Sequence, residues 1–151
     1  MNQVVVKQEK SGYQIVEAYK SLRTNLQFCG EDKKVIAVTS CTPNEGKSSV
    51  SMQLGISLAE SGKRVILIDA DLRKSVLLGR TKTQKSVRGL AHFLSGQATL
   101  EDVICSTNVK NFYMIYSGPF PPNPAELLGG KNFRSLLNAL RKVYDLSLIH
   151  I

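Results

Sequence analysis

The chain has 151 residues and a mass of 16.6 kDa, about the size of one domain. Hydrophobic residues make up 42% and charged residues 21%, which excludes a disordered or low-complexity chain. No apolar run approaches the roughly 18 residues of a membrane span, and the first residues lack the pattern of a signal peptide. We expect a globular cytoplasmic protein.

Cysteine and histidine usage gives no sign of a metal site. The three cysteines, Cys29, Cys41 and Cys105, are far apart, and none forms a Cys-x-x-Cys pair. His92 and His150 do not supply zinc-ligand spacing. We expect reduced thiols and no structural zinc.

The net charge of +8 points to anionic partners, and part of the excess is concentrated in one stretch. Residues 73–88 contain no Asp or Glu and six basic residues: Arg73, Lys74, Arg80, Lys82, Lys85 and Arg88. Three interpretations stay open: a solvated loop, attraction of phosphates to a nucleotide site, and docking on an acidic membrane. No DNA- or RNA-binding motif accompanies the charge, so specific nucleic-acid binding is not expected.

The first half of the chain predicts a helix, a strand and a second helix. Residues 12–26 have an apolar stripe at helical spacing, beside a face with Glu17, Lys20 and Arg23. Residues 35–39 are a short apolar run, which predicts a strand buried on both faces. A turn-rich loop leads to a helix over residues 47–60, which Gly62 ends in a left-handed conformation.

The second half of the chain continues the alternation of predicted strands and helices. Residues 65–68 predict a buried strand that stops at Asp69, and residues 112–116 predict another. Short helices are expected at 90–94 and 100–104, and a further helix starts at Asn123 with Pro124 in its first turn and Glu126 completing a capping box. Helical spacing continues over 133–140, and residues 146–151 predict a final strand. The expected fold is α/β: a three-layer, mostly parallel sheet with helices on both faces, incomplete at its C-terminus.

The strongest chemical signal lies between the first predicted strand and the helix at 47–60. Cys41-Thr42-Pro43-Asn44-Glu45-Gly46-Lys47-Ser48-Ser49 matches a phosphate-binding P-loop, except that Cys41 replaces the first glycine. Gly46 lets backbone N–H groups turn toward a phosphate, and the helix dipole points to the same place. Lys47 is expected to bridge the β- and γ-phosphates, Ser48 to ligate Mg²⁺, and Ser49 to add a donor. The sequence therefore predicts nucleotide binding by residues 42–49.

A second signal follows the strand at 65–68. Asp69 and Asp71 lie at the carboxyl edge of the predicted sheet, where ligands of α/β proteins bind. These carboxylates can hold Mg²⁺ directly or through water, and one can take a proton from an attacking hydroxyl. We therefore expect Lys47, Asp69 and Asp71 to be the catalytic residues, and Ser48, Asp69 and Asp71 to be the metal ligands.

These motifs resemble those of the bacterial tyrosine kinases of capsular and exopolysaccharide synthesis, within the wider superfamily of partition and division-site ATPases. The resemblance runs from about residue 17 to residue 145. It is carried by residues 17–25, 39–48, 66–74, 94–97 and 121–128. The proline-bearing run at 121–128 separates these kinases from the partition ATPases.

The resemblance implies a P-loop NTPase fold and autophosphorylation on tyrosine with ATP and Mg²⁺. It assigns phosphate binding to the P-loop, and Mg²⁺ coordination and acceptor activation to Asp69 and Asp71. It gives Glu17, Lys20 and Arg23 a role in ring-like self-association, although the family has arginine where this chain has Lys20. On this basis residues 1–30 form a helical self-association segment, and residues 31–151 form a truncated kinase domain.

The resemblance also implies partners. Family members of this short kind dock onto a membrane-anchored activator that controls chain length, so we expect a cytoplasmic protein recruited to the inner face of the plasma membrane. A tyrosine phosphatase and polysaccharide-synthesis enzymes are expected as regulators or substrates.

The chain departs from the family pattern after Asp145. His150 stands where the third metal-site aspartate belongs, and an imidazole is a poor substitute for a hard carboxylate beside Mg²⁺. We expect that an extended genomic sequence leads from Tyr144-Asp145 into that aspartate. For the chain as given, we expect weak binding of ATP and Mg²⁺ and little kinase activity. Two alternatives stay open: a partition- or division-type ATPase, and a non-catalytic subunit of a kinase ring.

Overall fold

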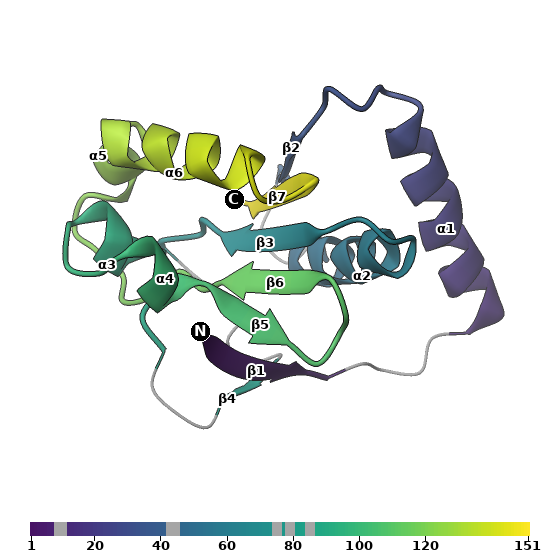
Figure 1. Cartoon of the computed structure of the whole chain (residues 1–151), viewed down its shortest axis with the longest axis horizontal. Helices are drawn as coiled ribbons and strands as arrows, with labels where there is room; N and C mark the ends of the chain where they lie inside the picture. Colours follow the sequence, from purple (N-terminus) through teal and green to yellow (C-terminus); the bar gives the residue numbers. More distant parts are fainter. Residues whose placement is uncertain (8–11, 42–45, 74–76, 78–80, 84–86) are drawn as a thin grey trace.

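The computed structural model describes residues 1–7, 12–41, 46–73, 77, 81–83 and 87–151. Their helices and strands follow in chain order (Figure 1). They are β1 (Asn2–Val6), α1 (Tyr13–Gln27), β2 (Val35–Val38), α2 (Lys47–Glu60), β3 (Val65–Asp69), β4 (Thr81–Thr83), α3 (Leu90–Leu94), α4 (Leu100–Val103), β5 (Cys105–Thr107), β6 (Phe112–Ile115), α5 (Pro124–Leu128), α6 (Lys131–Arg141) and β7 (Leu146–His150).

The strands form one sheet in the order β2-β7-β3-β6-β5-β1-β4. Neighbours β2, β7, β3 and β6 run parallel, whereas β5 is antiparallel to β6 and β4 is antiparallel to β1. The carboxyl ends of the four parallel strands therefore lie at one edge of the sheet, here called the carboxyl edge, and their starts form the amino edge. The predicted mostly parallel α/β sheet is confirmed.

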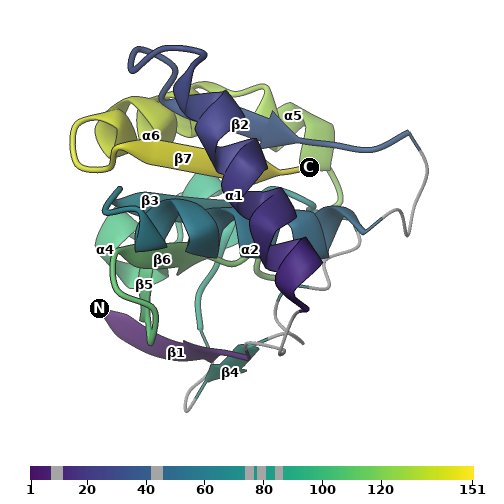
Figure 2. The same ribbon diagram turned by 90° about the vertical axis from the view of Figure 1, so that its right-hand side faces the viewer.

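Helices cover both faces of the sheet because the buried strands are apolar on both sides (Figures 1 and 2). Val65 and Leu67 of β3 belong to a core that includes residues of α2, and α1 lies outside α2. Ile66 and Ile68 alternate with them and belong to a second core with residues of α3 and α6. The period of two along β3 thus produces the predicted three layers.

Two predictions about individual elements are wrong. β2 is not buried on both faces: Ala37 is exposed, and the other residues of β2 are half-buried. The reason is that β2 ends the strand order and has only β7 beside it among the described strands. The capping box at α5 does not form, because the Asn123 side chain makes no bond to the helix backbone and lies 3.4 Å from Glu126 Oε2 instead.

Strands β1, β4 and β5 were not predicted from the sequence. Val4 and Val6 of β1 are 2% exposed because β1 pairs in parallel with β5 and continues the sheet. Conversely, the predicted apolar stripe of α1 contributes no fully buried residue. No helix within the described part of the chain has the length and apolar character needed to cross a membrane.

Candidate functional site

The P-loop occupies the connection from β2 to α2 at the carboxyl edge of the sheet. Gly46 has φ of +80° and caps α2, which begins at Lys47. A Cβ at Gly46 would meet no atom within 4 Å, so glycine is favoured by the backbone conformation and not by lack of space. The first turn of α2 leaves backbone N–H groups without partners in the helix, which is the anion-binding property of a helix N-terminus. The predicted phosphate-binding residues Thr42, Pro43, Asn44 and Glu45 lie outside the described residues.

The two predicted carboxylates lie at the same edge, at the end of β3. Asp69 is fully buried and Asp71 is half-buried. Asp69 Oδ1 accepts a hydrogen bond of 3.1 Å from the Asp71 N–H, and Asp71 Oδ1 accepts one of 3.3 Å from the Arg73 N–H. These bonds hold the chain in a tight turn as it leaves the sheet.

A histidine joins the P-loop helix to this carboxylate. His150 lies opposite Asp69 in the pairing of β7 with β3. The imidazole Nδ1 is 3.2 Å from Asp69 Oδ1, and its Nε2 is 2.9 Å from Ser48 Oγ. Ser48, Asp69 and His150 are all buried. The three side chains therefore form one buried hydrogen-bonded chain, Ser48–His150–Asp69.

Lys47 also contacts the residue that follows β7. Its Nζ donates a hydrogen bond to the backbone oxygen of Ile151, and the Ile151 N–H donates to Val38 O of the neighbouring strand. Ser49, the other predicted donor, is half-buried in the first turn of α2. The structure thus brings Lys47, Ser48 and Asp69 to one edge of the sheet, with the end of β7 among them.

The chemistry of these residues bears on whether a magnesium ion fits. The Ser48 hydroxyl and the Asp69 and Asp71 carboxylates are hard oxygen donors, the type that Mg²⁺ prefers. The imidazole of His150, however, lies between Ser48 and Asp69 and hydrogen-bonds both. Within the described residues no group of three or more His, Cys, Asp or Glu side chains is placed to hold a metal. With His150 in this position, the site does not fit a magnesium ion shared by Ser48 and Asp69.

A close backbone contact that no sequence motif predicts also shapes this edge of the sheet. The segment after β6 packs against the start of α3: Leu90 N donates to Tyr116 O at 2.6 Å, and Ala91 N donates to Ser117 O at 2.9 Å. A Cβ on Gly89 would lie 2.2 Å from Gly118 N. Two glycines 29 positions apart carry no local signal of this contact.

The predicted self-association face is only partly free at the surface. Lys20 Nζ and Glu17 Oε1 form an exposed ion pair of 3.3 Å on α1. Arg23 instead donates a hydrogen bond of 2.8 Å to Ser57 O and lies 3.4 Å from Ser57 Oγ on α2. Most of the basic stretch at 73–88 lies outside the described residues, so its three interpretations stay open.

Comparison of the sequence with known proteins identifies its relatives. The AAA domain family matches residues 33–150. The chain is 42% identical over 133 residues to the tyrosine-protein kinase CpsD of Streptococcus agalactiae, and the match covers 88% of the chain and 58% of CpsD. The chain thus spans little more than half the length of this curated relative.

Comparison with solved structures also finds a tyrosine kinase among the similar proteins. The kinase domain of the Escherichia coli tyrosine kinase ETK superposes with a TM-score of 0.82 at 36% identity, covering 89% of this chain and 53% of that one. The septum site-determining protein MinD of Pyrococcus horikoshii, solved with Mg-ADP, superposes with a TM-score of 0.64 at 27% identity. The match covers 78% of this chain and 48% of the MinD chain. The kinase domain is thus more similar than the division-site ATPase in both fold and sequence.

Proposed function

Because the chain belongs to the AAA domain family, we propose that it is the nucleotide-binding part of a protein-tyrosine kinase of capsule or exopolysaccharide synthesis. The single observation that carries the proposal is the meeting of the P-loop helix and the Asp69 carboxylate at one edge of the sheet, in a chain 42% identical to CpsD. The lower similarity to MinD supports a kinase over a division-type ATPase.

The proposed reaction transfers the γ-phosphoryl group of ATP to a tyrosine hydroxyl. Residues 42–49 bind the phosphates, with Lys47 and the N–H groups of the first turn of α2 stabilising their negative charge. The hydroxyl oxygen forms a bond to phosphorus as the bond to the leaving ADP oxygen breaks. Asp71 or Asp69 accepts the hydroxyl proton, for which a carboxylate at the carboxyl edge is suitably placed.

Magnesium is the proposed companion of the nucleotide, as in the MinD structure solved with Mg-ADP. Ser48, Asp69 and Asp71 are the proposed oxygen donors, and they become available only where His150 does not bridge the first two. In this chain, therefore, no step of the proposed reaction depends on a metal ion. We propose that the kinase activity of this chain is weak.

The proposal includes assembly and location. α1, with Glu17, Lys20 and Arg23, is proposed to take part in self-association. A membrane-anchored activator is the proposed partner at the inner face of the plasma membrane, and a tyrosine phosphatase and polysaccharide-synthesis enzymes are proposed regulators or substrates. The pathway context of these partners is supported by a Klebsiella pneumoniae relative that is named “Putative tyrosine-protein kinase in cps region”.

The direct experiment is incubation of the purified chain with ATP and Mg²⁺, followed by detection of phosphotyrosine. Lys47→Met is the matched negative control because it removes the proposed phosphate-binding ammonium. A signal that the control lacks supports kinase activity of this chain. If a longer form that carries aspartate at position 150 also gives no phosphotyrosine, the kinase proposal fails.

A second candidate is a non-catalytic subunit of a kinase ring. The observation that favours it is the imidazole of His150 between Ser48 and Asp69, which engages two of the three proposed metal donors. A pull-down against an intact kinase of the same family distinguishes the two: a subunit binds the kinase and adds no phosphotyrosine of its own.

A further inference from the structure

The amino edge of the sheet, opposite the P-loop, is a continuous surface made by four connections. Their backbones are joined: Ser147 N donates to Lys34 O, Asp145 N donates to Arg64 O, and Val65 N donates to Asn111 O, at 2.8 Å in each case. Figure 2 shows the connections that lead into β2 and β7 on the same side of the molecule. Residues 28–34, 61–64, 108–111 and 142–145, here called the amino-edge surface, therefore act as one face.

The amino-edge surface is basic. Its basic side chains outnumber its acidic ones by six to three. Asp32 lies 3.3 Å from Lys33, and Asp145 Oδ2 accepts a hydrogen bond from the Arg64 N–H, so two of the three carboxylates already have partners. The basic residues are Lys33, Lys34, Lys63, Arg64, Lys110 and Lys142, and the acidic ones are Glu31, Asp32 and Asp145.

Apolar side chains project from the same surface. Phe28 is 84% exposed at the end of α1, and Val143 is 52% exposed between α6 and β7. Lys142 directly precedes Val143, and Lys33 follows Phe28 in the same connection. Exposed apolar side chains flanked by cations are the combination with which peripheral proteins enter the boundary between lipid headgroups and acyl chains.

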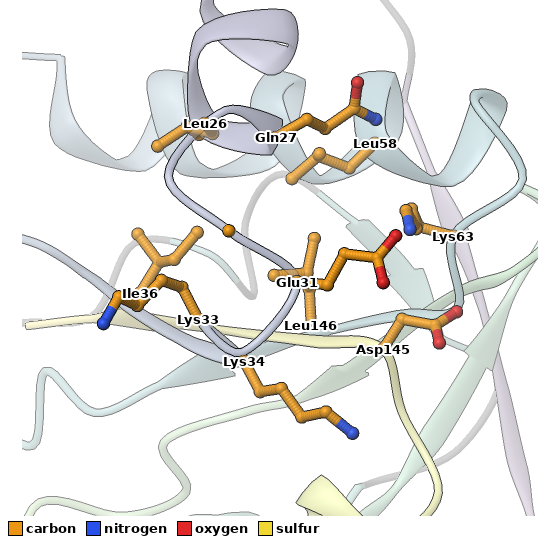
Figure 3. Close-up of a pocket in the computed structure, with 11 residues that line it drawn as sticks. Leu26, Gln27, Glu31, Lys33, Lys34, Ile36, Leu58, Lys63, Asp145 and Leu146 are labelled. Carbon is orange, nitrogen blue, oxygen red and sulfur yellow. The ribbon is translucent and has the colours of Figure 1, made fainter.

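A cavity of about 520 Å³ opens at the amino-edge surface, lined in part by residues of three of its connections (Figure 3). Leu26, Ile36, Leu58 and Leu146 give it apolar walls, and Lys33, Lys34 and Lys63 line it together with Glu31 and Asp145. Apolar walls with lysines at the margin suit a ligand that is apolar at one end and anionic at the other.

Arg64 adds a pre-oriented cation to this surface. Its guanidinium carbon lies 5.2 Å from the ring centre of Tyr113 and 5.1 Å from that of Tyr144, and the two rings meet edge to face at 5.2 Å. Cation–π contact with two rings restricts the guanidinium, and a planar guanidinium is well suited to phosphate oxygens.

We propose that the amino-edge surface docks directly on an anionic lipid membrane, with Phe28 and Val143 entering the headgroup region and the lysines and Arg64 contacting lipid phosphates. An acidic protein partner would also fit the charge of the surface, and binding to an acidic polypeptide alone is the outcome that would indicate one. The orientation that follows places the P-loop edge away from the bilayer, open to nucleotide and to other proteins. The proposal does not depend on kinase activity.

The test is co-sedimentation of the purified chain with vesicles of equal parts phosphatidylglycerol and phosphatidylcholine, and with vesicles of phosphatidylcholine alone. We expect binding to the first and little to the second. Lys33→Glu/Lys34→Glu lowers the partition coefficient on the anionic vesicles by at least about tenfold. Lys131→Glu/Arg134→Glu, which changes the net charge equally on exposed residues at the start of α6, lowers it by less than about threefold.

A second pair of variants tests the apolar contact. Phe28→Ser weakens binding to anionic vesicles, whereas Phe120→Ser, at a residue 58% exposed near the carboxyl edge, leaves it unchanged. Equal losses from the two charge variants, binding only to an acidic polypeptide such as polyglutamate, or no vesicle binding would each overturn the proposal. Lys47→Met retains vesicle binding, so failure here is distinguishable from failure of the kinase proposal.

Discussion

His150 of β7 faces Asp69 of β3 in register, with Nδ1 of the imidazole 3.2 Å from Oδ1 of the carboxylate. Its other ring nitrogen lies 2.9 Å from Ser48 Oγ at the start of α2. One side chain from the last strand therefore connects the P-loop helix to the buried aspartate that sequence reasoning assigned to metal binding.

Replacing His150 with aspartate is expected to make the stability of the protein depend on magnesium. In EDTA, His150→Asp places two carboxylates side by side, which lowers the free energy of unfolding by about 1–3 kcal/mol. Added Mg²⁺ recovers this loss, because an ion that binds only the folded state stabilises it. Thermal unfolding with EDTA and with Mg²⁺ measures both effects. His150→Asn is the uncharged control, and a melting temperature of His150→Asp that is indifferent to Mg²⁺ contradicts the assignment of the site.

Removing the Lys47 ammonium is expected to weaken nucleotide binding and leave the fold intact. Hydrogen bonds to charged groups contribute about 1.5–3 kcal/mol, so Lys47→Met raises the dissociation constant of a fluorescent ATP analogue by about 10- to 100-fold. Lys131→Met removes an exposed lysine from α6 and serves as the matched control. Equal affinities of the two variants would show that Lys47 does not contact phosphate.

An added methyl group at Gly89 is expected to destabilise the protein. The Cβ of Gly89→Ala would lie 2.2 Å from Gly118 N and 2.5 Å from its Cα, and backbone atoms cannot move aside as a side chain can. We expect a loss of about 1–3 kcal/mol in urea denaturation. At Gly12 no atom lies within 4 Å of the new Cβ. Gly12→Ala should therefore change the free energy of unfolding by only a small fraction of the Gly89→Ala loss. Similar losses at both positions would argue against the close contact.

Arg23 is expected to stabilise the isolated subunit, in addition to its proposed role in assembly. Its guanidinium hydrogen-bonds Ser57 O at 2.8 Å in a half-buried position, so Arg23→Ala should cost about 1–2 kcal/mol. Lys20→Ala breaks only the exposed pair with Glu17 and should cost less than about 0.5 kcal/mol. Urea denaturation at a concentration where sizing chromatography shows monomer is the measurement. A loss seen only in assembly would assign Arg23 to an interface between subunits.

The three cysteines should differ in how fast they react with a thiol reagent. Burial raises the pKa of Cys105 to about 11, whereas Cys29 and Cys41 are exposed. At pH 8, three units below this pKa, only about one Cys105 thiol in a thousand is ionised, because each pH unit below the pKa lowers the ionised fraction about tenfold. We expect two thiols to react quickly with a disulfide reagent such as DTNB, and the third only after unfolding. Three fast thiols at pH 8 would mean that β5 opens readily.

Raising the pH should also lower stability through Cys105. Between the ordinary thiol pKa near 9 and the raised value of about 11, the unfolded chain ionises while the folded one keeps its proton. Unfolding is therefore favoured progressively across that window. Cys105→Ala removes this dependence, and urea denaturation at pH 8 and pH 10.5 provides the comparison.

Local sequence alone determined the elements that carry the candidate site. α2 and β3 have the predicted extents within one residue, because a helix-period segment between Gly46 and Gly62 and a continuous apolar run each specify their structure locally. The P-loop spacing, Asp69 at the end of β3 and Asp71 just after it likewise predicted a site at the carboxyl edge, since parallel strands end together.

Tertiary structure decided what depends on neighbours distant in the sequence. The half-buried state of β2 follows from its place at the end of the strand order, and the burial of Val4 and Val6 follows from pairing with β5. Arg23 meets Ser57 only because α1 packs on α2. The position of His150 in the sequence predicted that it lies at the metal site. Its place between Ser48 and Asp69, however, depends on the register of β7 with β3, because pairing between strands is a non-local choice.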